Sequence, residues 1–517
     1  MNLETYYQSL SAEERTLQFG VETADPLTGA FPRKRVVHAG LQGQVLPADQ
    51  AQDIWQRLMA QRPDRTRLQT AYIHIPFCKT KCLYCGFFQN GTNQDEEDHY
   101  IDCLVQELEM AADQPRLRDG LIHAVFIGGG TPTSLSAANA RRLLQTIRRC
   151  LPLANDYELT LEGRIHDLVP EKMETWLRCG VNRVSLGVQS FHTQIRRQVG
   201  RLDDQDTVLK NLAALKAYEQ CAVVIDLIYG LPGQTEQVWK EDLDALVASG
   251  VDGADLYQLN VFEGSDLSRA IESGRLPPAA TTEEEARLFA LARDYMDRHA
   301  WKRLNICHWS CSNRERSLYN CLARSHATMF PFGSGAGGHM DGYSTMLHRS
   351  LLPYEAMIER GQKPFMALIK QNDLQNLVDT VQQQLEQGYL DLDGLAAVRP
   401  ELAGLRWLYQ LWEKRGLVQD TGVLCKLTAA GEFWQVNVTQ TTLECMQYLL
   451  TGKNSLAMEG IAAQDSQKVR DIVARMKAMK NHSSGMTDKI RAMQLMAETM
   501  KQLRPDEIQA VMKHMMD

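Results

Sequence analysis

Three closely spaced cysteines are the residues in this sequence best suited to metal chemistry. Cys78, Cys82 and Cys85 form a C-x3-C-x2-C pattern, which is short enough for three thiolates to reach one centre. Closed zinc sites take four ligands, and electron-transfer iron–sulfur clusters usually take four cysteines. His74 could complete a zinc set, but its alternation with two isoleucines favours a histidine of the core or behind the site. Three thiolates leave one coordination position for another ligand.

A [4Fe–4S] cluster with one free iron can chelate an amine and a carboxylate, and S-adenosylmethionine (SAM) offers that pair. The next motif fits such a ligand. Gly128, Gly129 and Gly130, followed by Thr131, bring backbone close to a ligand without obstruction by side chains. A phosphate-binding loop does not fit, because no Lys follows in the G-x-x-x-x-G-K register.

Short apolar runs that alternate with helical stretches predict the strands that position these motifs. This alternation is typical of parallel strands joined by crossover helices, and six such units predict an α/β fold with a partial (β/α)6 barrel. The predicted strands are Tyr72–Ile75, Ala124–Gly128, Tyr157–Glu162, Arg183–Val188, Val223–Ile228 and Asp255–Asn260.

Polar residues follow, end or interrupt these strands. The cysteines follow the first strand and the glycines the second, Glu162 and Gln189 end the third and fourth, and Asp226 interrupts the apolar fifth. The carboxyl ends of parallel barrel strands open on one face. We therefore expect these side chains to meet in one cleft.

Four segments of the sequence carry a resemblance to a known family. They resemble the radical SAM enzymes of the oxygen-independent coproporphyrinogen oxidase group over roughly residues 70 to 445. The segments are YIHIPFCKTKCLYCGFF, FIGGGTPT, VSLGVQSF and IDLIYGLPGQT.

The resemblance implies roles for individual residues. Cys78, Cys82 and Cys85 would hold the [4Fe–4S] cluster. The methionine amino group of SAM would meet Gly129, Gly130 and Thr131. The nucleoside or the carboxylate of SAM would be contacted by Glu162, Gln189, Arg201 and Asp226.

Local details favour the anaerobic haem-degrading branch of this group. Gly86 and Phe87 follow the third cysteine, where the decarboxylases of coproporphyrinogen carry a further cysteine. The branch implies a methyltransferase that opens the porphyrin of haem to a methylated linear tetrapyrrole and releases iron. It also implies a low-potential electron donor such as flavodoxin or ferredoxin. A haem chaperone with a [4Fe–4S] cluster and an oxygen-independent coproporphyrinogen III dehydrogenase remain as alternatives.

Composition bounds the partners and the location of the protein. The chain has 517 residues with 44% hydrophobic and 23% charged residues, close to globular averages. Its net charge of −8 argues against a bulk nucleic-acid binder. The sequence shows no signal peptide and no membrane-spanning stretch, which predicts a cytoplasmic protein. Twelve dilute cysteines argue against a disulfide scaffold.

The chain divides by pattern into five parts. We expect an N-terminal extension (1–65), the barrel (66–270), connecting helices with a Gly-rich segment (271–370), a winged-helix-like domain (371–450) and a Met-rich helical tail (451–517). Beyond 270 the strand pattern stops. His308 and His339 are the candidate iron ligands of a haem, although the sequence favours a packed or solvated histidine at both positions.

Overall fold

The structure, a computed structural model, describes residues 2–35, 43–86, 90–91, 93–325 and 327–452. The chain forms two compact units. Among the described residues, the larger unit contains 11–391 and 409–440, and the smaller one contains 2–10, 392–408 and 441–452. No helix in the described ranges is long and apolar enough to cross a membrane.

A parallel sheet of six strands forms the core of the larger unit, as the sequence predicts. The strands are adjacent in chain order: β2 (Gln69–Ile75), β5 (Ile122–Gly129), β6 (Leu153–Gly163), β7 (Arg183–Gln189), β8 (Ala222–Tyr229) and β9 (Gly253–Gln258). Strands that are buried on both faces are filled by β-branched and other apolar residues. Continuous apolar runs in the sequence therefore predict these six strands.

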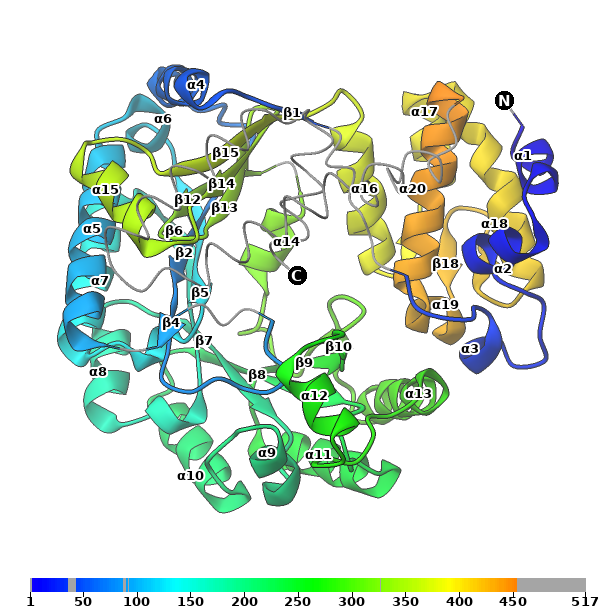
Figure 1. Cartoon of the computed structure of the whole chain (residues 1–517), viewed down its shortest axis with the longest axis horizontal. Helices are drawn as coiled ribbons and strands as arrows, with labels where there is room; N and C mark the ends of the chain where they lie inside the picture. The colour runs from blue at the N-terminus through cyan, green and yellow to red at the C-terminus, as the bar shows by residue number, and fades with distance from the viewer. Residues whose placement is uncertain (1, 36–42, 87–89, 92, 326, 453–517) are drawn as a thin grey trace. The chain divides into compact units, whose positions relative to one another are not determined.

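Crossover helices cover one face of this sheet (Figure 1). They include α5 (Gln94–Ala112), α7 (Ala137–Cys150), α8 (Pro170–Arg178), α10 (Gln205–Lys216) and α11 (Glu236–Ser249). Helix α7 shows why they form where they do. The Ser136 side chain caps its N-terminus by accepting from the Asn139 backbone N–H, and Leu143, Leu144 and Ile147 lie on its buried face.

The expectation that strands stop after residue 270 is wrong. The sheet continues at both edges to thirteen strands. Beside β9 lie β11 (His308–Ser310) and β10 (Lys302–Arg303). Beside β2 lie β12 (Thr328–Phe332), β13 (Gly337–Met340), β14 (Tyr343–Leu347), β15 (Phe365–Lys370) and β1 (Gln44–Val45). Several of these strands are short or Gly-rich, so their period-two signal is weak.

A short helix, α14 (Leu318–Ala323), lies on the opposite side of the sheet from the crossover helices (Figure 1). The Glu158 carboxylate accepts hydrogen bonds from the backbone N–H groups of Leu318 and Tyr319 at 2.9 and 3.0 Å. The Tyr319 ring stacks on Phe126 with a centroid separation of 4.6 Å. These contacts hold residues 305–323, which we call the inner segment, against the parallel strands.

The C-terminal part of the larger unit is helical with a small sheet. The strands β16 (Tyr389–Leu390), β18 (Cys425–Leu427) and β17 (Val418–Asp420) accompany α16 (Gln375–Glu386) and α19 (Ala429–Phe433). Part of the predicted N-terminal extension (1–65) also packs here. The Trp412 indole N–H donates to the carbonyl of Phe19 at 2.9 Å, beside helix α2 (Ala12–Phe19).

The smaller unit is helical where it is described. It includes α1 (Leu3–Ser9), α17 (Leu392–Val398) and the end of α20 (Gln435–Thr451). Tyr6 stacks on Tyr448 at 4.5 Å between ring centroids. From residue 453 onward, the predicted Met-rich tail (451–517) lies outside the described residues.

Candidate cofactor site at the carboxyl ends of the strands

The three cysteines lie on the loop that leaves the first parallel strand. Cys78 is in the short strand β3 (Phe77–Cys78), and both Cys78 and Cys82 are 2% exposed. Cys85 is half-buried, and its backbone N–H donates to the carbonyl of Cys82 at 3.1 Å, which closes a turn. This turn brings the second and third cysteines back toward each other.

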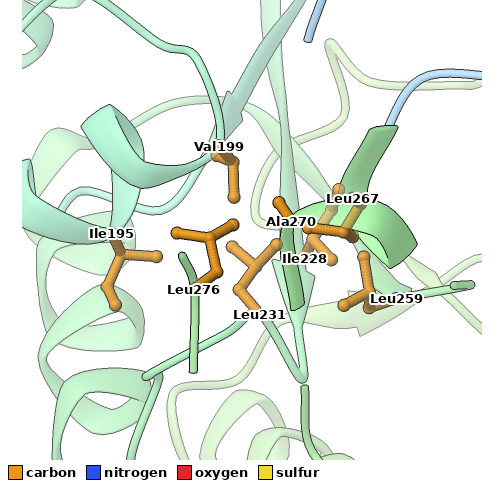
Figure 2. Close-up of a cluster of buried hydrophobic side chains, with 8 residues drawn as sticks. All are labelled: Ile195, Val199, Ile228, Leu231, Leu259, Leu267, Ala270 and Leu276. Carbon is orange, nitrogen blue, oxygen red and sulfur yellow. The ribbon is translucent and has the colours of Figure 1, made fainter. Parts of the chain in front are cut away.

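A hydrophobic cluster holds the cysteine loop in place. Its eight buried residues come from the helices α9 (Thr193–Gln198) and α12 (Asp266–Glu272), from β8, and from the loops that follow α9, β8, β9 and α12 (Figure 2). Leu83 and Tyr84, which stand between the second and third cysteines, pack against it. The Leu83 N–H also donates to the carbonyl of Val199 at 3.3 Å. The cysteine loop is therefore fixed by the apolar packing of Leu83 and Tyr84 and by this backbone hydrogen bond.

The chemistry of this loop fits a [4Fe–4S] cluster. Burial raises the pKa of the Cys78 thiol, and the Thr131 hydroxyl, 3.2 Å from its sulfur, opposes that rise. Metal binding would overcome the rise, because a bound iron deprotonates its thiol ligand. No three His, Cys, Asp or Glu side chains form a ready-made metal site within the described ranges.

The glycine motif lies beside the cysteine loop, and its glycines are required by close contacts. Gly129 has a φ of +111°, and a Cβ on it would lie 2.6 Å from the His74 ring. A Cβ on Gly130 would lie 2.4 Å from the carbonyl oxygen of Phe77. The backbone N–H of Thr131 donates to that same carbonyl at 2.8 Å. The motif is thus joined to the backbone just before Cys78.

His74 faces this glycine motif from β2, in agreement with its expected place inside the strand. Its Nδ1 is 3.0 Å from the Tyr72 hydroxyl. Burial lowers the pKa of His74 to about 4, so the ring is neutral at physiological pH. Its Nε2 is buried and has no hydrogen-bond partner within the described residues. A bound polar group would satisfy this atom.

Glu162 ends the third strand next to the glycine motif. Its carboxylate accepts from the Gly129 N–H at 3.2 Å. Burial raises the pKa of Glu162 to about 7. A Cβ on Gly128 would lie 2.5 Å from the same carboxylate, so only glycine leaves room for it.

Arg201 is positioned by a residue that the sequence analysis did not single out. Its guanidinium donates to the Tyr84 hydroxyl at 2.7 and 3.2 Å. A Cβ on Gly187 would lie 2.9 Å from Arg201 and 2.5 Å from the amide nitrogen of Gln189. Tyr84 thus joins the cysteine loop to the arginine, and the only hint in the sequence is its place between two cysteines.

Asp226 faces a second carboxylate across the sheet. It pairs in register with Asp255 on the neighbouring strand. Burial, with smaller contributions from the charges of Asp255 and Glu162, raises the pKa of Asp226 well above its ordinary value. Asp226 is therefore expected to retain a proton beside its carboxylate neighbours.

His308, a candidate haem ligand, is instead part of a buried charge network. It is 0% exposed, with Nδ1 2.9 Å from Asp255 and Nε2 3.1 Å from Glu315. Arg183 donates to both oxygens of Glu315 at 2.9 and 3.1 Å. Burial opposes the charged imidazole, but the two carboxylates raise the pKa of His308 to about 9. Both ring nitrogens face carboxylates, so this histidine is unsuited to bind a haem iron.

His339, the other candidate, lies far along the strands from the cysteine loop. It is on β13 and pairs with Met329, which in turn pairs with Thr70 at the start of β2. There it lines a cavity of about 450 Å³ with side chains of α16 and β14. The structure therefore groups the cysteines, the glycines, Glu162, Gln189, Arg201 and Asp226 at one end of the barrel. His308 lies on the strand next to β9, against Asp255, and His339 lies away from this end.

Comparison with known proteins identifies the family of this chain. Residues 72–246 match the family model of the radical SAM superfamily. Anaerobilin synthase of Escherichia coli O157:H7 is 40% identical over 403 residues, which cover 78% of this chain and 89% of the relative. The haem chaperone HemW of Bacillus subtilis is 31% identical over 54% of this chain and 73% of its own length.

A solved structure shows the same fold. Coproporphyrinogen III oxidase (HemN) of Escherichia coli matches with a TM-score of 0.68 at 21% identity, over 79% of this chain and 96% of that one. Radical SAM proteins use a [4Fe–4S] cluster and SAM, so the cofactors expected from the sequence are confirmed. The chain belongs to the radical SAM superfamily, in the group that also contains anaerobilin synthase, HemW and oxygen-independent coproporphyrinogen oxidase.

Proposed function

We propose that this protein degrades haem without oxygen, as a radical SAM methyltransferase that opens the porphyrin to a methylated linear tetrapyrrole and releases iron. The 40% identity to anaerobilin synthase across 89% of that relative is the observation that carries the proposal. The residue two positions after Cys85 supports it too, because this sequence has Phe87 where the decarboxylase pattern carries a further cysteine.

The residues grouped at the strand ends would hold the two cofactors. Cys78, Cys82 and Cys85 would ligate three irons of the cluster. The backbone of Gly129 and Gly130 with Thr131 would meet the amino group of SAM. Its nucleoside and carboxylate would be contacted by Glu162, Gln189, Arg201 and Asp226. When bound and reduced by a donor such as flavodoxin or ferredoxin, the cluster supplies the electron that cleaves SAM.

The chain's own side chains would bind and orient SAM. Arg201, held in place by Tyr84, can donate to a carboxylate. Glu162 has a pKa of about 7, so near neutral pH it can accept or donate a hydrogen bond to a ribose hydroxyl. The buried carboxylates of Glu162 and Asp226 avoid mutual repulsion by retaining protons.

An anaerobic turnover assay tests the proposal. The reconstituted protein is incubated with haem, SAM and dithionite, and the Soret band and product masses are followed. We expect loss of the Soret band, a linear tetrapyrrole heavier by a methyl group, and free iron. Intact haem alongside accumulating 5′-deoxyadenosine would exclude haem as the substrate.

The second candidate is a haem chaperone, favoured by the 31% identity to HemW over 54% of this chain. A chaperone would bind haem stoichiometrically and keep it intact in the same assay. Release of CO₂ from coproporphyrinogen III would instead indicate the third alternative, the oxidative decarboxylase.

A further inference from the structure

Exposed apolar residues gather around the end of β9. The described residues include eleven large hydrophobic side chains that are exposed, and three of them lie between residues 257 and 262. Tyr257 is 43% exposed, Val261 43% and Phe262 59%. Single exposed hydrophobics are ordinary, but a group of them marks a site of interaction.

The segment that carries them is tied to the cysteine loop. We call residues 260–266 the mouth loop. At its end, the Leu267 N–H donates to the carbonyl of Leu83 at 3.1 Å, and Asp266 pairs with Lys81 at 2.5 Å. A Cβ on Gly86 would lie 3.9 Å from the Phe262 ring. The exposed ring therefore lies beside Gly86, directly after the third cysteine.

Both ends of the mouth loop are anchored in the same core. Leu259 before it is 5% exposed, and Leu267 after it is 0% exposed. Both belong to the hydrophobic cluster against which Leu83 and Tyr84 pack, and Figure 2 shows them close together. Val261 and Phe262 are thus presented to solvent from a short loop with fixed ends. Their exposure is part of the folded structure.

Tyr257, the third exposed residue of this group, lies near the end of β9. The charge of Asp255 raises the pKa of Tyr257 well above its ordinary value, which keeps its hydroxyl protonated. The tyrosine offers an apolar ring with one polar end.

On the basis of the proposed function, we propose that Tyr257, Val261 and Phe262 form the subsite that receives one apolar face of the tetrapyrrole substrate. A planar macrocycle needs a largely apolar surface with few polar anchors. The SAM nucleoside is a poorer occupant, because the side chains assigned to it come from β6, β7 and β8 and from Arg201, whereas this surface follows β9. The macrocycle would then lie beside the cysteine loop, where a reaction with SAM must occur.

Titration with zinc protoporphyrin tests the subsite on the full-length protein. This probe is fluorescent and does not need reductant, so binding is measured apart from turnover. We expect Phe262→Ser to weaken binding about tenfold, the effect of removing one well-buried aromatic contact. Phe262→Leu, which keeps apolar area, should restore most of the affinity. Leu121→Ser is the matched control, because Leu121 is 53% exposed but precedes β5 at the other end of the strands.

The outcomes separate this inference from the proposed function. If the wild-type protein binds no porphyrin, both fail. If the wild-type protein binds the porphyrin and Phe262→Ser binds it equally well, while the two proteins have the same melting temperature, only the subsite is wrong. If Phe262→Ser weakens SAM binding instead of porphyrin binding, the surface belongs to the nucleoside and the inference is likewise overturned.

Discussion

At the scale of single residues, His308 shows how burial changes what a side chain can do. A histidine between two cysteines looks like a metal ligand in the sequence. In the structure it is a buried cation between Asp255 and Glu315. Asp255 pairs with Asp226 in the sheet, so the positive charge of His308 lies one residue away from Asp226, a residue proposed for the nucleoside. Its contribution is electrostatic and structural.

Substitution of His308 by Gln should therefore be costly and pH-dependent. Removing one partner of a buried ion pair costs about 3 kcal/mol. The folded pKa of His308, about 9, lies above the unfolded value of about 6.5. Its stabilisation is therefore complete below pH 6.5 and lost as pH rises through 9. Denaturant unfolding of both proteins from pH 6 to 10 should show the gap between them closing. A gap that is constant with pH would contradict a charged His308.

The cysteine triad permits a second test at the residue scale. Replacing Cys78, Cys82 or Cys85 by Ala should abolish the iron–sulfur absorbance near 400 nm and the formation of 5′-deoxyadenosine, since three thiolates are needed to hold the cluster. Cys311→Ala is the control, because Cys311 is exposed and lies on the inner segment. Undiminished cluster content in a triad variant would remove the basis of the proposed function.

At the scale of elements, the site is made by neighbouring strands that end together. Gly128 on β5 leaves room for the Glu162 side chain, and Gly187 on β7 leaves room for Gln189 and Arg201. The strands carry the polar groups, and the glycines leave the space that these side chains occupy.

Gly187→Ala should test this arrangement. Its Cβ would lie within 3 Å of Gln189 and Arg201 and would displace both side chains. We expect the dissociation constant of SAM to rise at least tenfold, with cluster content unchanged. Gly337→Ala is matched to it, because a Cβ there meets only Thr345 O at 3.6 Å. Equal SAM affinity of the two variants, measured by equilibrium dialysis, would argue against the assignment.

At the scale of the whole molecule, all residues proposed for the two cofactors lie in the larger unit, between residues 78 and 226. A chain that ends after Gly452 should therefore keep the cluster and still cleave SAM with dithionite. Iron content and 5′-deoxyadenosine formation would be compared with those of the full chain. Loss of the cluster in the shortened chain, if it remains folded by circular dichroism, would show that the site needs residues beyond Gly452.

The sequence by itself determined the six parallel strands, the cysteine loop, the glycine motif and the cofactors, because each is encoded by local pattern or spacing. Apolar runs identify buried strands, and thiol spacing identifies a cluster loop, whatever the rest of the chain does. The strands after residue 270 were missed, because short edge strands with glycines have little periodicity.

Only the tertiary structure decided which side chains from distant segments meet. Arg183 and Glu315 are 132 residues apart yet form a bidentate pair, and Tyr84 reaches Arg201 across 117 residues. Such contacts depend on strand register and on the packing of the inner segment, and neither leaves a local signal. For the same reason, His308 could be assigned as a buried cation only after the strands around it were in place.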